Sequence, residues 1–178
     1  MNAIREIGYK KILKFLLSTV VDVFFSFMIL PPMRVWFLRA GGASIGKDVV
    51  IHSISFMNLY RGSFKNLIIG DNSFLGQDVL LDLADTITLG KHVTVGPRTI
   101  ILTHLNVGYK DHPLQKHFSA HTKATECGDG VFIGVQSTLL AGVKIGVNSM
   151  IGAHSLVRED VPEHSVYAGV PAKKIRGI

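Results

Sequence analysis

Half of the chain's eight histidines lie in one short stretch near its middle, at His104, His112, His117 and His121. A neutral imidazole near pH 7 can take the proton from an attacking hydroxyl group, a role worth about 10²–10⁴ in rate. Imidazole nitrogens are also common zinc ligands. This stretch therefore has to be considered for two kinds of chemistry, general-base catalysis and metal binding.

His104 is the strongest candidate for a general base. It stands at the end of a regular run of short repeats, where the chain leaves them for a long loop of about residues 105–126. A histidine at such a junction is held by a rigid element and still opens to a cleft. His112, which Pro113 follows, is the alternative base. A loop histidine without a catalytic role is a further interpretation.

A catalytic imidazole needs a hydrogen-bond acceptor at its second ring nitrogen. A backbone carbonyl could serve, and so could a carboxylate from a neighbouring coil. The repeat loses its register over residues 81–86, which places Asp82 and Asp85 on the coil below His104. Asp78 lies one corner earlier. Solvated corner carboxylates explain these residues equally well.

The elements that position these residues follow a six-residue rhythm. From Cys127 the chain reads CGDGVF, IGVQST, LLAGVK, IGVNSM, IGAHSL and VREDVP. A period of six fits neither a helix nor a flat strand and is typical of a solenoid. We expect the first residue of each hexad to point inward, the fifth to fit a tight interior, and the second-position glycine to relieve the corner backbone. The first positions are Cys127, Ile133, Leu139, Ile145, Ile151 and Val157.

The same rhythm begins at Ile45 and continues to about Ile100, with breaks at residues 57–68 and 81–86. The sequence therefore predicts an all-β solenoid domain over residues 41–178. Within it, residues 105–126 form a long loop and residues 162–178 form a C-terminal cap. Two prolines and a Lys/Arg cluster in that cap should blunt the open edge of the solenoid.

Residues 1–40 lie outside the repeat and predict a helical segment. Ile12–Leu30 is strongly apolar, is preceded by basic residues and is closed by Pro31–Pro32. On a helix its polar residues fall on one narrow stripe, Lys11, Lys14, Ser18, Asp22 and Ser26. This pattern favours a helix in a membrane interface, with contact through residues 1–32. The alternative is a helix that packs on the solenoid or on a neighbouring subunit.

The composition narrows the range of ligands. A formal net charge of +6 suits anionic ligands such as a phosphorylated cofactor. Nucleic acid is not expected, because no Lys/Arg run with interleaved aromatic residues appears. The single cysteine excludes an internal disulfide and fits a reducing compartment such as the cytoplasm. Its inward hexad position predicts that Cys127 fills the core.

The hexads, together with the ending YAGVPAKKIRGI (Tyr167–Ile178), resemble the hexapeptide-repeat acyltransferases. Within them the chain is similar to sugar O-acetyltransferases of the galactoside and maltose type and to their polysaccharide-biosynthesis relatives. The resemblance covers about Arg34 to the C-terminus. It implies a left-handed parallel β-helix, a homotrimer, and transfer of acetyl groups from acetyl-CoA. The implied acceptor is a sugar hydroxyl of a cell-surface polysaccharide or its lipid-linked precursor. We expect the apolar N-terminal helix to hold the trimer at the inner face of the membrane, near such substrates.

The resemblance also implies roles for residues. The Thr103–His104 pair resembles the motif of the catalytic histidine in the polysaccharide relatives. Polar residues around Asp78 and Asp82 would contact the acceptor sugar, although this chain does not reproduce the family's Asn/Asp pattern there. Coenzyme A would lie in a groove between two subunits, and no metal is expected. The residues implied for its binding are Gly134, Ala141 and Ala153 for backbone contacts, and Arg158, Lys173 and Arg176 at the phosphate end.

Two other functions fit parts of the sequence. The gamma-class carbonic anhydrases share the hexapeptide solenoid and bind zinc through three histidines across a subunit interface. His112 and His117 have a suitable short spacing, but they lie in the loop, outside the rigid coils that a zinc site needs. The other alternative is a non-catalytic membrane-associated scaffold that keeps the solenoid for assembly only.

Overall fold

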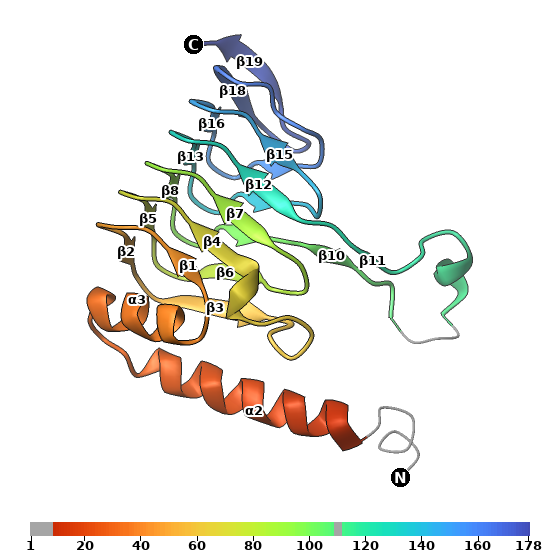
Figure 1. The fold of residues 1–178 in the computed structure, drawn as a ribbon. Coiled ribbons are helices and arrows are strands. Elements are labelled where there is room, and N and C mark those ends of the chain that lie inside the picture. The colour runs from red at the N-terminus through yellow and green to blue at the C-terminus, as the bar shows by residue number, and fades with distance from the viewer. Residues whose placement is uncertain (1–8, 109–111) are drawn as a thin grey trace.

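The described residues fold into two α-helices followed by a parallel β-solenoid of about five turns (Figure 1). The structure is a computed structural model that describes residues 9–108 and 112–178. The helices are α2 (Tyr9–Ser26) and α3 (Pro31–Ala40). The predicted all-β solenoid with an N-terminal helical segment is confirmed.

Each turn of the solenoid contributes one short strand to each of three parallel sheets, which we call A, B and C. Sheet A contains β1 (Ser44–Ile45), β4 (Leu67–Ile69), β7 (Ile87–Leu89), β12 (Thr125–Cys127) and β15 (Lys144–Ile145). Sheet B contains β2 (Val50–Ile51), β5 (Phe74–Leu75), β8 (Thr94–Val95), β13 (Phe132–Ile133), β16 (Met150–Ile151), β18 (Ser165–Ala168) and the antiparallel β19 (Lys173–Gly177). Sheet C contains β3 (Ile54–Met57), β6 (Val79–Asp82), β9 (Ile100–Ile101), β14 (Thr138–Leu139) and β17 (Leu156–Val157).

The interior is built as the hexads predict. The six first-position residues from Cys127 to Val157 are at most 3% exposed. The fifth positions are also buried, whether β-branched like Val131 or small like Ser137. Burial raises the pKa of the Cys127 thiol to about 12, which agrees with a residue that fills the core.

The predicted reason for the second-position glycine is wrong. A Cβ on Gly134 would lie 2.4 Å from the backbone nitrogen of Ala153 in the next turn, so this glycine permits close stacking of turns. The left-handed backbone of the corner occurs at the fourth position instead, as at Gln136 with φ 57° and Asn148 with φ 54°. Side chains stay compact at the second position because of the neighbouring turn, not because of the local φ angle.

The outer faces of the sheets differ in polarity. Sheet A presents charged side chains, among them Glu126 and Lys144, which form an ion pair at 3.2 Å. Sheet B presents a ladder of exposed apolar side chains, which we call the sheet B ladder: Val50, Phe74, Phe132 and Met150. Such a ladder indicates an interaction surface, since solvent-facing strands normally alternate with polar residues.

The N-terminal helices cover the first turn of the solenoid (Figure 1). Phe25 of α2 packs on Phe37 of α3 and on Phe56 of β3, with ring centroids 5.8 and 5.2 Å away. The sequence predicts that Pro31–Pro32 closes the apolar segment within a helical region of residues 1–40, and in the structure these prolines begin the second helix, α3. Proline suits the first positions of a helix because its fixed φ is helical and its missing N–H would be unpaired there.

None of the helices in the described ranges is long and apolar enough to cross a bilayer. Within α2, Asp22 is half-buried, and burial raises the pKa of its carboxyl to about 6. Its Oδ1 atom is buried without a hydrogen-bond partner among the described residues. The polar stripe of α2 therefore faces the protein at this point.

The long loop leaves the solenoid after β9 and returns at β12 (Figure 1). Its two ends pair as the antiparallel strands β10 (His104–Leu105) and β11 (His121–Thr122). The described residues also form short 3₁₀ helices: η2 (Pro113–Lys116) lies in this loop, and η1 (Phe64–Asn66) lies in the break between β3 and β4. The loop is therefore a projecting hairpin whose first residue is His104.

Candidate active site

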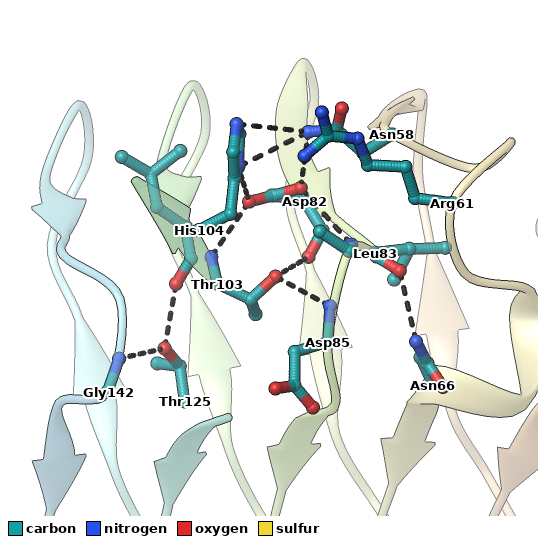
Figure 2. A network of polar contacts seen from close by, with 12 residues as sticks. Asn58, Arg61, Asn66, Asp82, Leu83, Asp85, Thr103, His104, Thr125 and Gly142 are labelled. Atoms are coloured by element: carbon teal, nitrogen blue, oxygen red, sulfur yellow. Dashed lines mark hydrogen bonds and ion pairs between the residues drawn. The ribbon is translucent and has the colours of Figure 1, made fainter. Parts of the chain in front are cut away.

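Three irregular corners stack along one edge of the solenoid, where sheet C passes to sheet A; we call it the C–A edge. Asn58 directly follows β3, Asp82 is the last residue of β6, and His104 begins the hairpin that follows β9 (Figure 2). The strands before them pair in parallel register, with Met57 beside Asp82 and Leu81 beside Ile101. Because neighbouring strands lie about 4.8 Å apart, the three side chains meet.

The centre of the site is a pair formed by His104 and Asp82. Asp82 Oδ2 accepts a hydrogen bond from His104 Nδ1. The aspartate side chain is fully buried, whereas the histidine side chain is 18% exposed. Since an ionised carboxylate can only accept, Nδ1 carries the proton and Nε2 has a free lone pair. In this tautomer Nε2 is the ring nitrogen that can accept a proton.

Three other groups donate to the same carboxylate. Asn58 Nδ2 donates to Asp82 Oδ1 at 2.8 Å, and the backbone N–H groups of Ala84 and Thr103 donate at 3.2 and 2.9 Å. Burial alone would raise the pKa of Asp82. The hydrogen bonds from His104, Asn58, Thr103 and Ala84 outweigh burial, so the pKa of Asp82 lies below its ordinary value. Asp82 is therefore held as an anion beside the imidazole.

Asn58 is the member of the site that the sequence analysis missed. Its Nδ2 lies 3.2 Å from His104 Nδ1 and 3.4 Å from Nε2, so its amide contacts both the ring and the carboxylate. Its backbone has φ 58°, in the left-handed region that asparagine tolerates better than most residues. The available signal was an asparagine at the first break in the rhythm, one turn before the Asp82 break.

Thr103 and Asp85 support the pair from behind (Figure 2). The buried Thr103 hydroxyl donates to the backbone carbonyl of Asp82 at 2.7 Å and accepts from the N–H of Asp85 at 3.0 Å. The Asp85 carboxylate accepts from the N–H of Thr86 at 2.7 Å. Of the two aspartates expected below His104, Asp82 contacts the imidazole ring, whereas the Asp85 carboxylate forms its hydrogen bond within its own corner.

Asp78 and His112 lie elsewhere. Asp78 stands on the edge where sheet B passes to sheet C, which we call the B–C edge. It lies 3.8 Å from Arg98 and accepts from the Ser53 hydroxyl at 3.3 Å. His112 precedes η2, where its Nδ1 accepts from the N–H of Leu114 at 3.2 Å. Neither residue adjoins His104 through these contacts.

The residues considered for coenzyme A occupy three places. Ala141 and Arg158 lie on the C–A edge, on the two turns that follow His104, and Arg158 pairs with Glu159 at 3.2 Å. Gly134 and Ala153 stack on each other at the B–C edge. Lys173 and Arg176 are exposed on β19, beside β18. One chain therefore does not bring all of them to His104.

Two further observations bear on the alternatives. A groove of about 730 Å³ runs along sheet A, with Thr88, Glu126 and Lys144 in its wall, but His104 does not line it. Over residues 9–108 and 112–178, no three His, Cys, Asp or Glu side chains gather as metal ligands. Among the described residues, the Asn58–Asp82–His104 cluster is therefore the candidate active site.

Comparison with known proteins identifies the type of repeat. A family model described as the hexapeptide repeat of succinyl-transferase matches residues 66–97 and 126–156. The Escherichia coli (strain K12) protein WcaF, named for an acetyltransferase role in colanic acid biosynthesis, is 32% identical over 144 residues. That match covers 80% of this chain and 74% of WcaF. The chain belongs to the hexapeptide-repeat acetyltransferase family.

Solved structures agree with this family. A maltose O-acetyltransferase from Clostridium difficile 630 superposes on the acetyltransferase with a TM-score of 0.80 at 25% identity, covering 96% of this chain and 89% of that one. A hexapeptide-repeat acetyltransferase from Vibrio cholerae O1 biovar eltor, solved with acetyl-CoA, gives a TM-score of 0.76 at 25% identity. That match covers 90% of this chain and 84% of the other.

Family membership confirms the resemblance and its main consequences. The solenoid is the left-handed β-helix of hexapeptide repeats, and the protein is an acetyl-CoA-dependent acetyltransferase. Acetyl-CoA is its donor. The alternatives of a carbonic anhydrase and of a non-catalytic scaffold are therefore not the function of this chain.

Proposed function

We propose that the acetyltransferase modifies a sugar hydroxyl of a cell-surface polysaccharide or its lipid-linked precursor, with His104 as general base. The observation that carries the proposal is the His104–Asp82 pair. A fully buried, ionised Asp82 accepts from Nδ1 of the partly exposed ring, so that in the neutral imidazole Nε2 is the nitrogen that can accept a proton. That arrangement suits removal of a proton from a hydroxyl group.

In this mechanism His104 Nε2 accepts the proton of the acceptor hydroxyl while the hydroxyl oxygen bonds to the acetyl carbonyl carbon. The imidazolium that forms is stabilised by the Asp82 carboxylate. When the carbon–sulfur bond breaks, His104 returns the proton to the sulfur of coenzyme A. The imidazole thus ends the cycle neutral, and Asn58 and Thr103 keep its partner in place throughout.

The names of two relatives support the sugar acceptor. WcaF is named for colanic acid biosynthesis, and the Clostridium difficile enzyme is a maltose O-acetyltransferase. The rim of the site is polar, which suits a sugar: the exposed Arg61 lies beside Asn58 (Figure 2). Arg61 Nε donates to the Tyr60 hydroxyl at 3.1 Å. An acceptor hydroxyl would approach His104 along this rim.

We further propose a homotrimer in which neighbouring copies complete the donor site. The sheet B ladder supports self-association, because it offers several large apolar side chains on one flat face. The proposed donor contacts of one copy, Gly134 and Ala153, would then lie across a groove from Ala141 and Arg158 of the next. Lys173 and Arg176 would bind the phosphates of coenzyme A, and Asp78 would reach the acceptor only from a neighbouring copy.

The decisive experiment is release of free thiol from acetyl-CoA with a panel of acceptors. The panel contains free sugars, lipid-linked glycans, amino sugars and amino acids. We expect release that depends on a sugar, with a mass increase of one acetyl group on a hydroxyl. Transfer only to an amine or to an amino acid would contradict the sugar hydroxyl as acceptor.

A further inference from the structure

The apolar arc of α2 faces outward. The residues of this helix that turn toward the protein include Ser18 and Asp22, which are half-buried, and Phe25, which is buried. Most of the side chains that remain exposed on α2, or directly after it at Phe27, are large and apolar: Leu13, Phe15, Leu16, Leu17, Val20, Val23, Phe24 and Phe27. Lys14, Thr19 and Ser26 are exposed as well. The helix therefore turns the middle of its polar stripe, Ser18 and Asp22, toward its own protein and an apolar arc outside.

The exposed surface continues onto the next segment. Ile29 and Leu30 between the helices and Met33 and Trp36 on α3 are exposed, Trp36 by 69%. We call the exposed apolar side chains of residues 9–36 the end face, because the two helices lie across the N-terminal end of the solenoid (Figure 1). Contiguous apolar surface of this kind marks a site of interaction in most proteins.

The charge of the chain is concentrated around the end face. Residues 9–66 contain eight Lys or Arg and two Asp or Glu, and the rest of the chain contains eleven of each. The whole net charge of +6 therefore belongs to the first turn and its helices. Lys14, Arg39 and Lys65 are exposed there. The exposed Arg61 is also near α2, because its neighbour Tyr60 packs on Phe15 at 5.9 Å between ring centroids.

From these observations we propose that the end face binds the surface of an anionic phospholipid bilayer. The apolar arc would enter the boundary between headgroups and acyl chains, and the surrounding cations would contact lipid phosphates. A second copy of the chain fits less well, since pairing two end faces would bring two regions of net charge +6 together. The sheet B ladder offers a separate surface for self-association.

This placement bears on the acceptor, and here the inference rests on the proposed function. Phe25 of α2 packs on Phe56 of β3, the strand that leads to Asn58. His104 lies two turns further along the same edge, which corresponds to about 10 Å at the usual strand spacing. A sugar attached to a membrane lipid would therefore be held near the height of His104.

Trp36, the only tryptophan of the chain, provides a fluorescence probe of the end face. Full-length protein is mixed with vesicles of phosphatidylcholine, or of phosphatidylcholine and phosphatidylglycerol at three to one, and then sedimented. We expect binding to the anionic vesicles, a blue shift of Trp36 emission, and quenching by brominated lipid. Binding to pure phosphatidylcholine should be about tenfold weaker, because the cations then lack partners.

A matched pair of double variants tests the surface itself. Val20→Glu with Phe27→Glu places two charges on the end face, at side chains that are 65% and 75% exposed. Val170→Glu with Ile178→Glu places the same charges at the C-terminal end, at side chains that are 72% and 67% exposed. We expect the first variant to lose vesicle binding by about tenfold or more, and the second to bind like the unmodified protein.

Two outcomes would overturn the proposal. One is failure of the unmodified protein to bind anionic vesicles while Trp36 stays open to acrylamide. The other is a Trp36 that is shielded without vesicles and becomes open when the end-face variant dissociates, which would assign this surface to a second copy. Acetyl transfer to free sugars in solution is measured separately. If vesicle binding persists without sugar acetylation, the proposed function fails and the docking surface stands.

Discussion

The two halves of the solenoid are built from the same repeat but differ in the corners between their strands. From Cys127 to Val161 the hexads run without interruption, and their corners are tight. Between Ala43 and Leu105, three corners are enlarged, and all three lie on the C–A edge. Those corners carry Asn58, Asp82 and His104. The regular half thus provides a rigid frame, and the interruptions in the other half carry the residues that we propose for catalysis.

The sharpest way to test this comparison is to replace one histidine in each kind of corner. We expect His104→Ala to fold normally and to lose at least about 10²-fold in kcat/KM for acetyl transfer, because the proton acceptor is gone. His92 occupies a regular corner and is exposed with φ 56°, so His92→Asn keeps the left-handed backbone and should keep activity. Near-normal turnover by His104→Ala would remove His104 from the mechanism.

Asp82→Asn should reduce activity by about 10²-fold, because an amide no longer fixes the proton on His104 Nδ1 or stabilises the imidazolium. It should also lower the free energy of unfolding by about 2 kcal/mol at pH 7, since the carboxylate accepts four hydrogen bonds in a buried place. Urea unfolding and steady-state rates measure the two effects.

The pH dependence of this stability difference follows from the lowered pKa of Asp82. A group whose pKa is lower in the folded state stabilises the fold above its unfolded pKa, about 3.9 for aspartate, and loses that contribution as the pH falls through the folded value. The advantage of the unmodified protein over Asp82→Asn should be constant from about pH 5 to 8 and shrink below about pH 4. A difference that grew on acidification would contradict the assignment.

Substitution of Asn58 should reduce activity less than substitution of Asp82, because Asn58 only positions the carboxylate and the imidazole ring from the side. We expect Asn58→Gly and Asn58→Ala to lose about tenfold in kcat with little change in KM for acetyl-CoA, since one hydrogen bond to a charged partner is worth about 1.5–3 kcal/mol. Only the alanine variant should lose a further ~1 kcal/mol of stability, because its φ of 58° strains an alanine and not a glycine. Equal stability of the two variants would argue against that strain.

This comparison also explains what the sequence could predict. The buried first positions, such as Ile133 and Ile151, follow directly from the period of six, because a side that returns every six residues must face inward each time. His104 was visible as the residue where the rhythm ends. The family model likewise matches residues 66–97 and 126–156 and leaves out the stretch that contains His104.

The parts that escaped prediction depend on how irregular segments pack. Asn58 reaches Asp82 because of the path of the loop after β3, which no periodicity encodes. Asp78 and Asp82 are close in sequence, yet β6 separates them onto two different edges of the solenoid. The sequence predicts one helical region over residues 1–40, but not the second helix that begins at Pro31, since a proline pair is compatible with both a helix stop and a first helical turn.

The smallest expected effect belongs to the regular half. Ser149 is buried, and its hydroxyl donates to the carbonyl of Pro162 at 2.8 Å and accepts from the N–H of Ser165 at 3.1 Å. Ser149→Ala should lower the free energy of unfolding by about 1–2 kcal/mol, a loss of a few degrees in Tm, because two backbone groups lose a partner. Its kcat and KM should match the unmodified enzyme, since the change lies away from the C–A edge. A fall in kcat at unchanged fold would mean that the uninterrupted turns also affect catalysis. The assignment of a purely structural role to the regular half would then be wrong.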